Sequence, residues 1–210
     1  MNEFGRQYVE YVHSLTQRQY RAGLLISMIL PVIVVLLFRN TEIVFLLPIV
    51  FFPFISPRGI IQKMRSDNLQ TWLCLSGDLK DVFAKMIFMT LKRVAVQLCV
   101  SLSMLMLSYY ILHGIDISPF NLIYTLLLMA LILIMNVLMW ILYARLNKSR
   151  VQIIEMISML IVCILPVATI FIDTSYFIAV IGVTDVLLAY CSLHLINNLT
   201  VNKEKFIEGD

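Results

Sequence analysis

The chain has 210 residues, of which 60% are hydrophobic and 14% charged, and its mean hydropathy is +0.90. This composition excludes an ordinary soluble domain, because such domains carry about a quarter charged residues. The formal net charge of +3 says little by itself. The hydrophobic residues form long continuous blocks, whereas a transmembrane β-barrel would show short alternating segments. The sequence therefore predicts an all-α, polytopic membrane protein.

Residues 1–22 precede the first apolar block and predict an amphipathic helix. Phe4, Tyr8, Val12 and Leu15 recur at helical spacing, and arginines occupy the other faces. Aromatic residues and arginines beside an apolar block are typical of a helix that lies in the headgroup plane. We interpret this segment as an N-terminal interfacial helix, with an ordinary solvated extension as the alternative.

Two short apolar blocks follow, Gly23–Phe38 and Ile43–Ile55, within residues 23–57. Both are short against the roughly 20 residues that span a bilayer. They form either two short spans or one re-entrant hairpin, and each possibility returns the chain to its starting side.

A charged loop, residues 58–85, separates these blocks from four longer ones within residues 86–196, and a polar tail, 197–210, ends the chain. The sequence thus predicts six transmembrane helices. The last four blocks are Met86–Leu112, Asn121–Tyr143, Val151–Ile172 and Tyr176–Ile196.

Six spans place all of the 16 Lys and Arg residues except Arg39 on one side of the membrane. Cytoplasmic loops carry the excess of Lys and Arg. The N-terminus, the charged loop and the C-terminus are therefore predicted to be cytoplasmic.

The sequence lacks the motifs of several enzyme classes. It has no Walker A motif, no H-E-x-x-H and no G-x-S-x-G. An intramembrane enzyme would need Asp185 and a second intramembrane acid to converge, and no second acid is evident. We expect no catalytic residue, no bound cofactor, no metal and no nucleic acid partner.

Asp185 lies halfway along the sixth block, where an ionised side chain is costly. At helical spacing it shares a face with Gly182, Ala189 and Ser192, and small residues let another helix approach closely. Asp185 is therefore predicted to point into the bundle, either as a translocation-path or gating carboxylate or as a buried polar anchor.

Further polar residues lie inside the third and fourth blocks. Arg93, Gln97 and Ser101 form a stripe along the third, and Asn136 lies deep in the fourth. Such a stripe can line a translocation path, but we prefer the interpretation that it holds helices together.

The charged loop contains a short predicted helix, Asp67–Leu75. Asp67 and Gln70 form a capping-box arrangement at its start, and Gly77 follows its end. A second helix is predicted from Asp78 through Lys85 into the third block. The residues of the short helix that we expect to contact a soluble partner are Asp67, Asn68, Leu69, Gln70, Trp72, Leu73 and Leu75.

The run RSDNLQTWLCLS from Arg65 to Ser76, followed by Asp78-Leu-Lys and by Ala84-Lys85, resembles the segment after the second span of ABC-2-type transporter permeases. In that family the segment is a coupling helix that seats in a cleft on the ATP-binding subunit. The usual glycine-threonine is replaced here by Asp67-Asn68.

The resemblance implies a permease subunit of a bacterial ABC exporter in the cytoplasmic membrane. Its partners would be a separate ATPase that carries ATP and Mg²⁺, a second permease subunit and membrane lipid. The substrate would be an amphipathic or antimicrobial peptide, with lipid or drug export as comparable possibilities. The alternative is a membrane scaffold or assembly factor that transports nothing and docks a different cytoplasmic protein.

Overall fold

The computed structural model describes residues 3–37, 60, 79–114, 119–145, 153–154, 156–157, 160 and 174–198. These residues form four long helices and no strand, and all four helices are long and apolar enough to cross a membrane. The predicted all-α class is confirmed. The helices are α1 (Glu3–Leu37), α7 (Leu79–His113), α8 (Pro119–Arg145) and α10 (Thr174–Asn197).

The predicted second and fifth blocks lie wholly or mostly outside the described residues, and so does the predicted helix Asp67–Leu75. The described part of the chain therefore contains four candidate spans, not the six that the sequence predicted.

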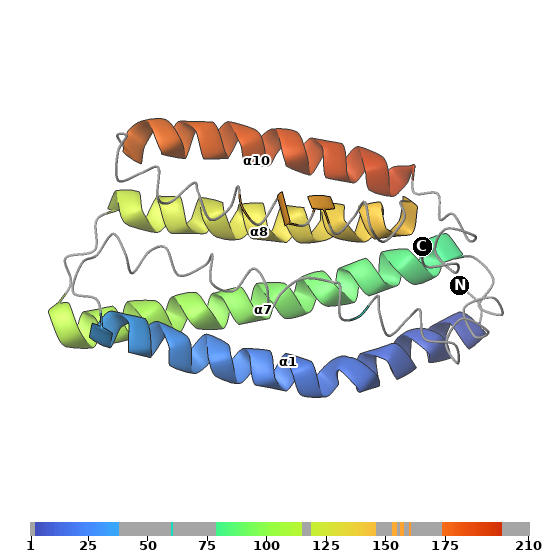
Figure 1. The fold of residues 1–210 in the computed structure, drawn as a ribbon, viewed down its shortest axis with the longest axis horizontal. Helices are drawn as coiled ribbons and strands as arrows, with labels where there is room; N and C mark the ends of the chain where they lie inside the picture. The colour runs from blue at the N-terminus through green and yellow to red at the C-terminus, as the bar shows by residue number, and fades with distance from the viewer. Residues whose placement is uncertain are drawn as a thin grey trace.

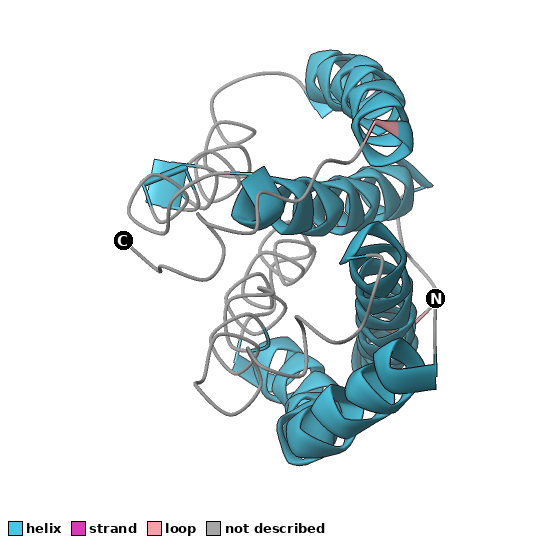
Figure 2. Cartoon of the chain, turned by 90° about the vertical axis from the view of Figure 1, so that its right-hand side faces the viewer, coloured by secondary structure: helices cyan, strands magenta, loops and turns pink. Residues whose placement is uncertain are grey.

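The helices lie side by side in the order α1, α7, α8, α10 (Figure 1). α1 and α7 run in one direction, and α8 and α10 run in the opposite one. The starts of α1 and α7 and the ends of α8 and α10 consequently share one end of the molecule. Because Lys80 and Arg145 lie at this end, it is called the basic end below. Figure 2 looks at that end and shows the same order from bottom to top.

α1 is continuous across the boundary that the sequence predicted at residues 22 and 23. It also contains Pro31, which is buried. The predicted interfacial segment and the first apolar block are thus one helix. Of the apolar residues predicted for that segment, Tyr8 and Val12 are buried in the protein, whereas Phe4 is 55% exposed.

The predicted helix from Asp78 into the third block is confirmed, since α7 begins at Leu79. It ends at His113, where Gly114 has a φ of +83° and donates its N–H to the carbonyl of Tyr110 at 3.2 Å. A left-handed glycine is the common way to end a helix. Pro119 then starts α8, and proline suits a first helical position because it has no N–H to leave unpaired.

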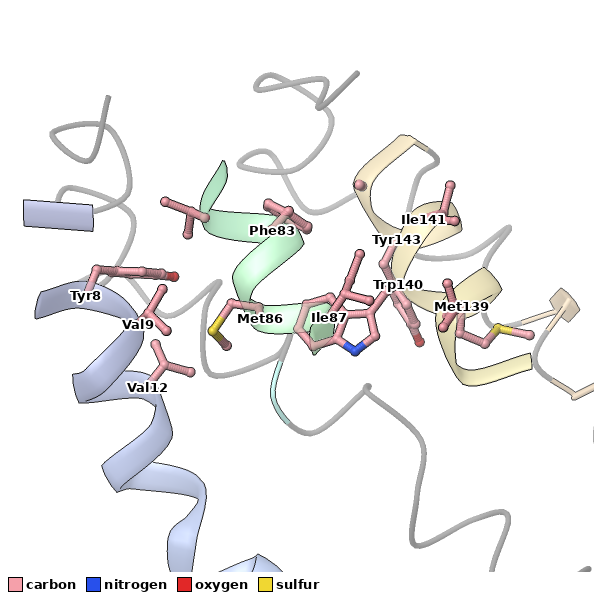
Figure 3. Packing of buried hydrophobic residues seen from close by; sticks show 13 residues of the cluster. Tyr8, Val9, Val12, Phe83, Met86, Ile87, Met139, Trp140, Ile141 and Tyr143 are labelled. Atoms are coloured by element: carbon pink, nitrogen blue, oxygen red, sulfur yellow. The ribbon is translucent and has the colours of Figure 1, made fainter. Parts of the chain in front are cut away.

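Among the described residues, the largest core cluster lies towards the basic end and joins three helices (Figure 3). Tyr8 and Val12 come from α1, Phe83 from α7, and Trp140 and Tyr143 from α8. The rings of Phe83 and Trp140 meet edge to face, with centroids 6.1 Å apart and planes at 86°. This geometry adds to the stabilisation from burial alone.

α1 and α7 are longer than a bilayer core requires. Each has 35 residues, or about 52 Å at ~1.5 Å per residue, against roughly 30 Å of hydrocarbon. The excess of about 20 Å must project beyond the hydrocarbon or be taken up by tilt. Since the first half of α1 is its polar half, projection at the basic end is the simpler solution.

Two cations tie the end of α10 to its neighbours. Lys80 Nζ donates to the carbonyl of Asn197 at 3.0 Å, and Arg145 Nη2 donates to the carbonyl of Asn198 at 2.5 Å. The last carbonyls of a helix lack partners within it and carry partial negative charge, so cationic donors suit them. α7, α8 and α10 are thus connected at the basic end.

Candidate functional site

Arg93 is the centre of a polar contact between α7 and α1. Its Nη1 donates to Thr16 Oγ1 at 2.7 Å, and its Nη2 donates to His13 at 2.6 Å from Nδ1 and 3.1 Å from the backbone carbonyl. The guanidinium carbon also lies 5.0 Å from the centre of the Tyr20 ring, within range of a cation–π interaction. Arg93 therefore binds three successive turns of α1.

The contact favours the neutral form of His13. A guanidinium can only donate hydrogen bonds, and Arg93 Nη2 lies 2.6 Å from Nδ1 and 3.1 Å from Nε2 of the ring, so a ring nitrogen that accepts from it is unprotonated. Burial and the charge of Arg93 both hold the pKa of His13 below its ordinary value. A small cavity of about 10 Å³ adjoins the pair, with Thr16 and Thr90 in its wall, which is room for roughly one water molecule.

Gln97 lies one turn further along α7 and packs on Gly23. A Cβ built on Gly23 would lie 2.3 Å from Gln97 Nε2, so the absent side chain of Gly23 is what admits the glutamine. Gln97 is buried. One turn on in α1, Ser27 is also buried and donates to the carbonyl of Gly23 at 2.9 Å.

Ser101 and Asn136 are both buried, at 3% exposure each. Ser101 continues the stripe of Arg93 and Gln97 on α7. Asn136 is on α8. The structure thus places the first two stripe residues in the α1–α7 contact and Asn136 on a different helix.

Asp185 is at the middle of α10, the helix that packs against α8. It is 6% exposed, and neither carboxylate oxygen has a hydrogen-bond partner among the described residues. Its neighbour one turn earlier, Ile181, is buried against Tyr124 and Leu128 of α8. The prediction that Asp185 points into the bundle is consistent with this burial.

The small residues near Asp185 differ in their burial and in their contacts. Ser192 is buried and Ala189 half-buried. A Cβ on Gly182 would meet no atom of the described residues within 4 Å, so no described helix approaches closely at Gly182. The close approach occurs instead at Gly23, between α1 and α7.

The structure therefore contains two separate polar places. The Arg93 cluster joins α1 to α7, whereas Asp185 is buried on α10, one turn from Ile181, which packs on α8, and no ion pair joins Arg93 to Asp185. Within the described ranges, no three His, Cys, Asp or Glu side chains are grouped so that they could hold a metal ion.

Sequence reasoning missed the α1 half of the Arg93 cluster. His13, Thr16, Tyr20, Gly23 and Ser27 follow one another at alternating intervals of three and four residues. This spacing places them on one helix face, and that face carries polar and small residues on both sides of the boundary predicted at residues 22 and 23. This polar face of α1 could have been recognised from the sequence.

The residues predicted to dock a soluble partner, Asp67–Leu75, lie outside the described residues. Comparison of the chain with protein-family models, with curated proteins and with solved structures finds no match.

Proposed function

We propose that this chain is the membrane-spanning permease subunit of an ABC exporter. The observation that carries the proposal is the arrangement of helix ends. The predicted docking helix ends at Leu75, four residues before the first residue of α7. α7 begins at the end of the molecule where Lys80 and Arg145 also lie. That end is the cytoplasmic one by the positive-inside rule, which is where an ATPase would meet it.

The structure of the basic end suits the transmission of movement. The first turns of α7 pack against α1 and α8 through Phe83 and its core neighbours, and Lys80 connects them to the end of α10. A force on the segment just before α7 would therefore act on several helices together, because a packed core moves as a unit.

The finer parts of the proposal follow the sequence resemblance. They are six spans, a separate ATPase that binds ATP and Mg²⁺, and a second permease subunit, identical or related. A peptide is the proposed substrate class, with lipids and drugs as alternatives. The sequence predicts only a three-residue turn, 173–175, between the last two blocks, which would leave little room for re-entrant helices, and in the structure Thr174 and Ser175 already belong to α10.

Co-purification tests the docking role. We expect that Trp72→Asp combined with Leu73→Asp abolishes recovery of a Walker-motif ATPase with the chain, while membrane insertion is retained. The matched control is Trp72→Phe with Leu73→Met, which keeps the apolar face and should keep the ATPase. Retention of the ATPase by the double aspartate variant would refute the coupling role. Recovery of a different soluble protein, lost in that variant, would indicate a scaffold.

Labelling of a cysteine at position 174 tests the topology. Thr174 begins α10 at the end opposite the basic end. In a background without the native cysteines, we expect an impermeant thiol reagent to label Thr174→Cys only from outside the cell. Labelling only from the cytoplasm would overturn the proposed orientation.

A further inference from the structure

The carboxylate of Asp185 is buried without any described group to compensate its charge. Both oxygens are inaccessible and accept no hydrogen bond from the described part of the chain. In the apolar interior of a membrane protein, an ionised carboxylate in that condition is strongly disfavoured. A carboxyl group buried in this way is therefore either protonated or paired with a bound cation.

The helix that packs on α10 offers no cation to Asp185. α8 contains no Lys, Arg, His, Asp or Glu from Phe120 to Ala144, and its titratable group nearest to the Ile181 contact is Tyr124. On α10 itself the other titratable groups are Tyr176, Tyr190, Cys191 and His194. His194 is nine residues from Asp185, about 13 Å along the helix at ~1.5 Å per residue.

A proton suits this surrounding better than a metal ion does. Hard cations take six or more oxygen ligands, whereas the contact one turn from Asp185 is made by Ile181, Tyr124 and Leu128. A protonated carboxyl needs only one acceptor for its O–H. α10 already satisfies hydroxyls in this way, since Thr184 donates to the carbonyl of Val180 at 2.7 Å.

We propose that Asp185 is a proton-binding site whose protonated form allows α10 to pack against α8. The neutral acid can donate to a backbone carbonyl one turn earlier and remain in the apolar contact. The ionised form would require water or a cation, and neither can enter while the two helices are packed. Loss of the proton therefore favours separation of α10 from α8 at this level.

Labelling with a hydrophobic carbodiimide tests the proposal on the full chain in native membranes. The reagent adds to a protonated carboxyl: the acid proton moves to a carbodiimide nitrogen, and the carboxyl oxygen bonds to the central carbon. Proteolysis and mass spectrometry then locate the adduct. We expect an adduct at Asp185 at about pH 6 that falls roughly tenfold or more by about pH 9, because the reactive form is lost as the proton leaves.

Two controls make the labelling specific. Glu10, whose side chain is 67% exposed and pairs with Arg6, is the exposed carboxyl for comparison, and a reagent that partitions into the apolar interior should leave it unlabelled. Asp185→Asn is neutral and nearly the same shape, so it should insert normally and lose the adduct. An adduct at Asp185 that does not change with pH would overturn the proposal.

Infrared spectroscopy covers the case in which the packed helices exclude the reagent. The difference between the native chain and Asp185→Asn should contain the C=O stretch of a protonated carboxylic acid at about pH 6. That band with no adduct still supports the proposal. Absence of both the band and the adduct would overturn it. Neither measurement needs the ATPase, so the result is independent of the proposed exporter role.

Discussion

Replacing Arg93 with methionine should weaken the contact between α1 and α7 more than any other single change to a charged residue of the described helices. The substitution keeps the apolar stem and removes three hydrogen bonds to His13 and Thr16 together with the contact to the Tyr20 ring. Hydrogen bonds of a charged group contribute about 1.5–3 kcal/mol each. This loss of stability is partly offset, because the half-buried guanidinium no longer has to be desolvated when the chain folds. We expect a net loss of about 2–4 kcal/mol in the free energy of unfolding.

The fluorescence of Trp140 provides the assay. Trp140 is fully buried in the cluster that joins α1, α7 and α8, so its emission reports the packing of these three helices. Unfolding by SDS from a mild detergent would be followed in a Trp72→Phe background, which leaves Trp140 as the single tryptophan. The matched control is Lys92→Met, because Lys92 is the adjacent residue and is exposed. It should change stability by no more than about 0.5 kcal/mol.

A double-mutant cycle separates the contact from general effects of the substitution. Arg93→Met and Thr16→Val should show a coupling of about 1 kcal/mol or more, because the two side chains share one charge-assisted hydrogen bond. Equal stabilities of Arg93→Met and Lys92→Met would refute the argument, since Arg93 would then contribute no more to the free energy of unfolding than the exposed Lys92 does. Full additivity with Thr16→Val would refute the Thr16 contact alone.

Three further predictions concern other contacts of the described helices. Gly23→Ala should destabilise the chain by about 1 kcal/mol in the same SDS assay, because its Cβ displaces the end of Gln97, and Gln97→Ala should relieve most of that loss. Lowering the pH should weaken the contact between α1 and α7. The pKa of His13 is lowered in the folded chain, so the unfolded chain binds more protons below about pH 6.5 and stability falls as the pH falls through that value. The SDS midpoint should therefore drop between about pH 7.5 and about pH 5.5 in the native chain, and less in His13→Gln. Lys80→Met should accelerate amide hydrogen exchange in the last turn of α10, because the carbonyl of Asn197 loses its cationic donor.

Controls for these predictions come from the same helices. For Lys80, the control is Lys85→Met, which changes an exposed lysine of α7 and should leave exchange in α10 unchanged. For Gly23, the control is Gly182→Ala, whose Cβ would meet no atom of the described residues within 4 Å and should be tolerated. A pH effect of the same size in His13→Gln would assign the titration to another group.

The helical class and the helix ends could be predicted from the sequence because they depend on local properties. Continuous apolar blocks predict helices in a membrane chain, since only internal hydrogen bonds satisfy the backbone there. The start of α7 after Asp78 and its end before Gly114 follow from residues that cap helices wherever they occur. Burial of Asp185 followed from the cost of an exposed charge in the same way.

The pairing of the helices could not be predicted with equal certainty, because it depends on how distant faces complement one another. The stripe of Arg93 and Gln97 was visible, but the face of α1 that contacts it was not recognised, because residues 1–22 were interpreted as a separate helix in the headgroup plane. That interpretation broke the helix at residue 22, because it took the change from polar to apolar composition as a boundary. In the structure α1 continues through Gly23, and Gln97 packs on this glycine, so Gly23 serves the contact between helices and does not end α1.

The Arg93 cluster and Asp185 differ in how firmly they hold neighbouring helices together, and this difference affects which helices can move. Arg93 is bound to α1 by several directed hydrogen bonds, which hold α1 and α7 in one register as a pair. Asp185 has no directed partner among the described residues, so the contact of α10 with α8 near it rests on apolar packing and on the charge state of one carboxyl. Apolar packing has little directional preference, and a helix held in this way can shift at lower cost than one held by charge-assisted hydrogen bonds. If the bundle moves, the α8–α10 contact is therefore the one that should open, while α1 and α7 move together.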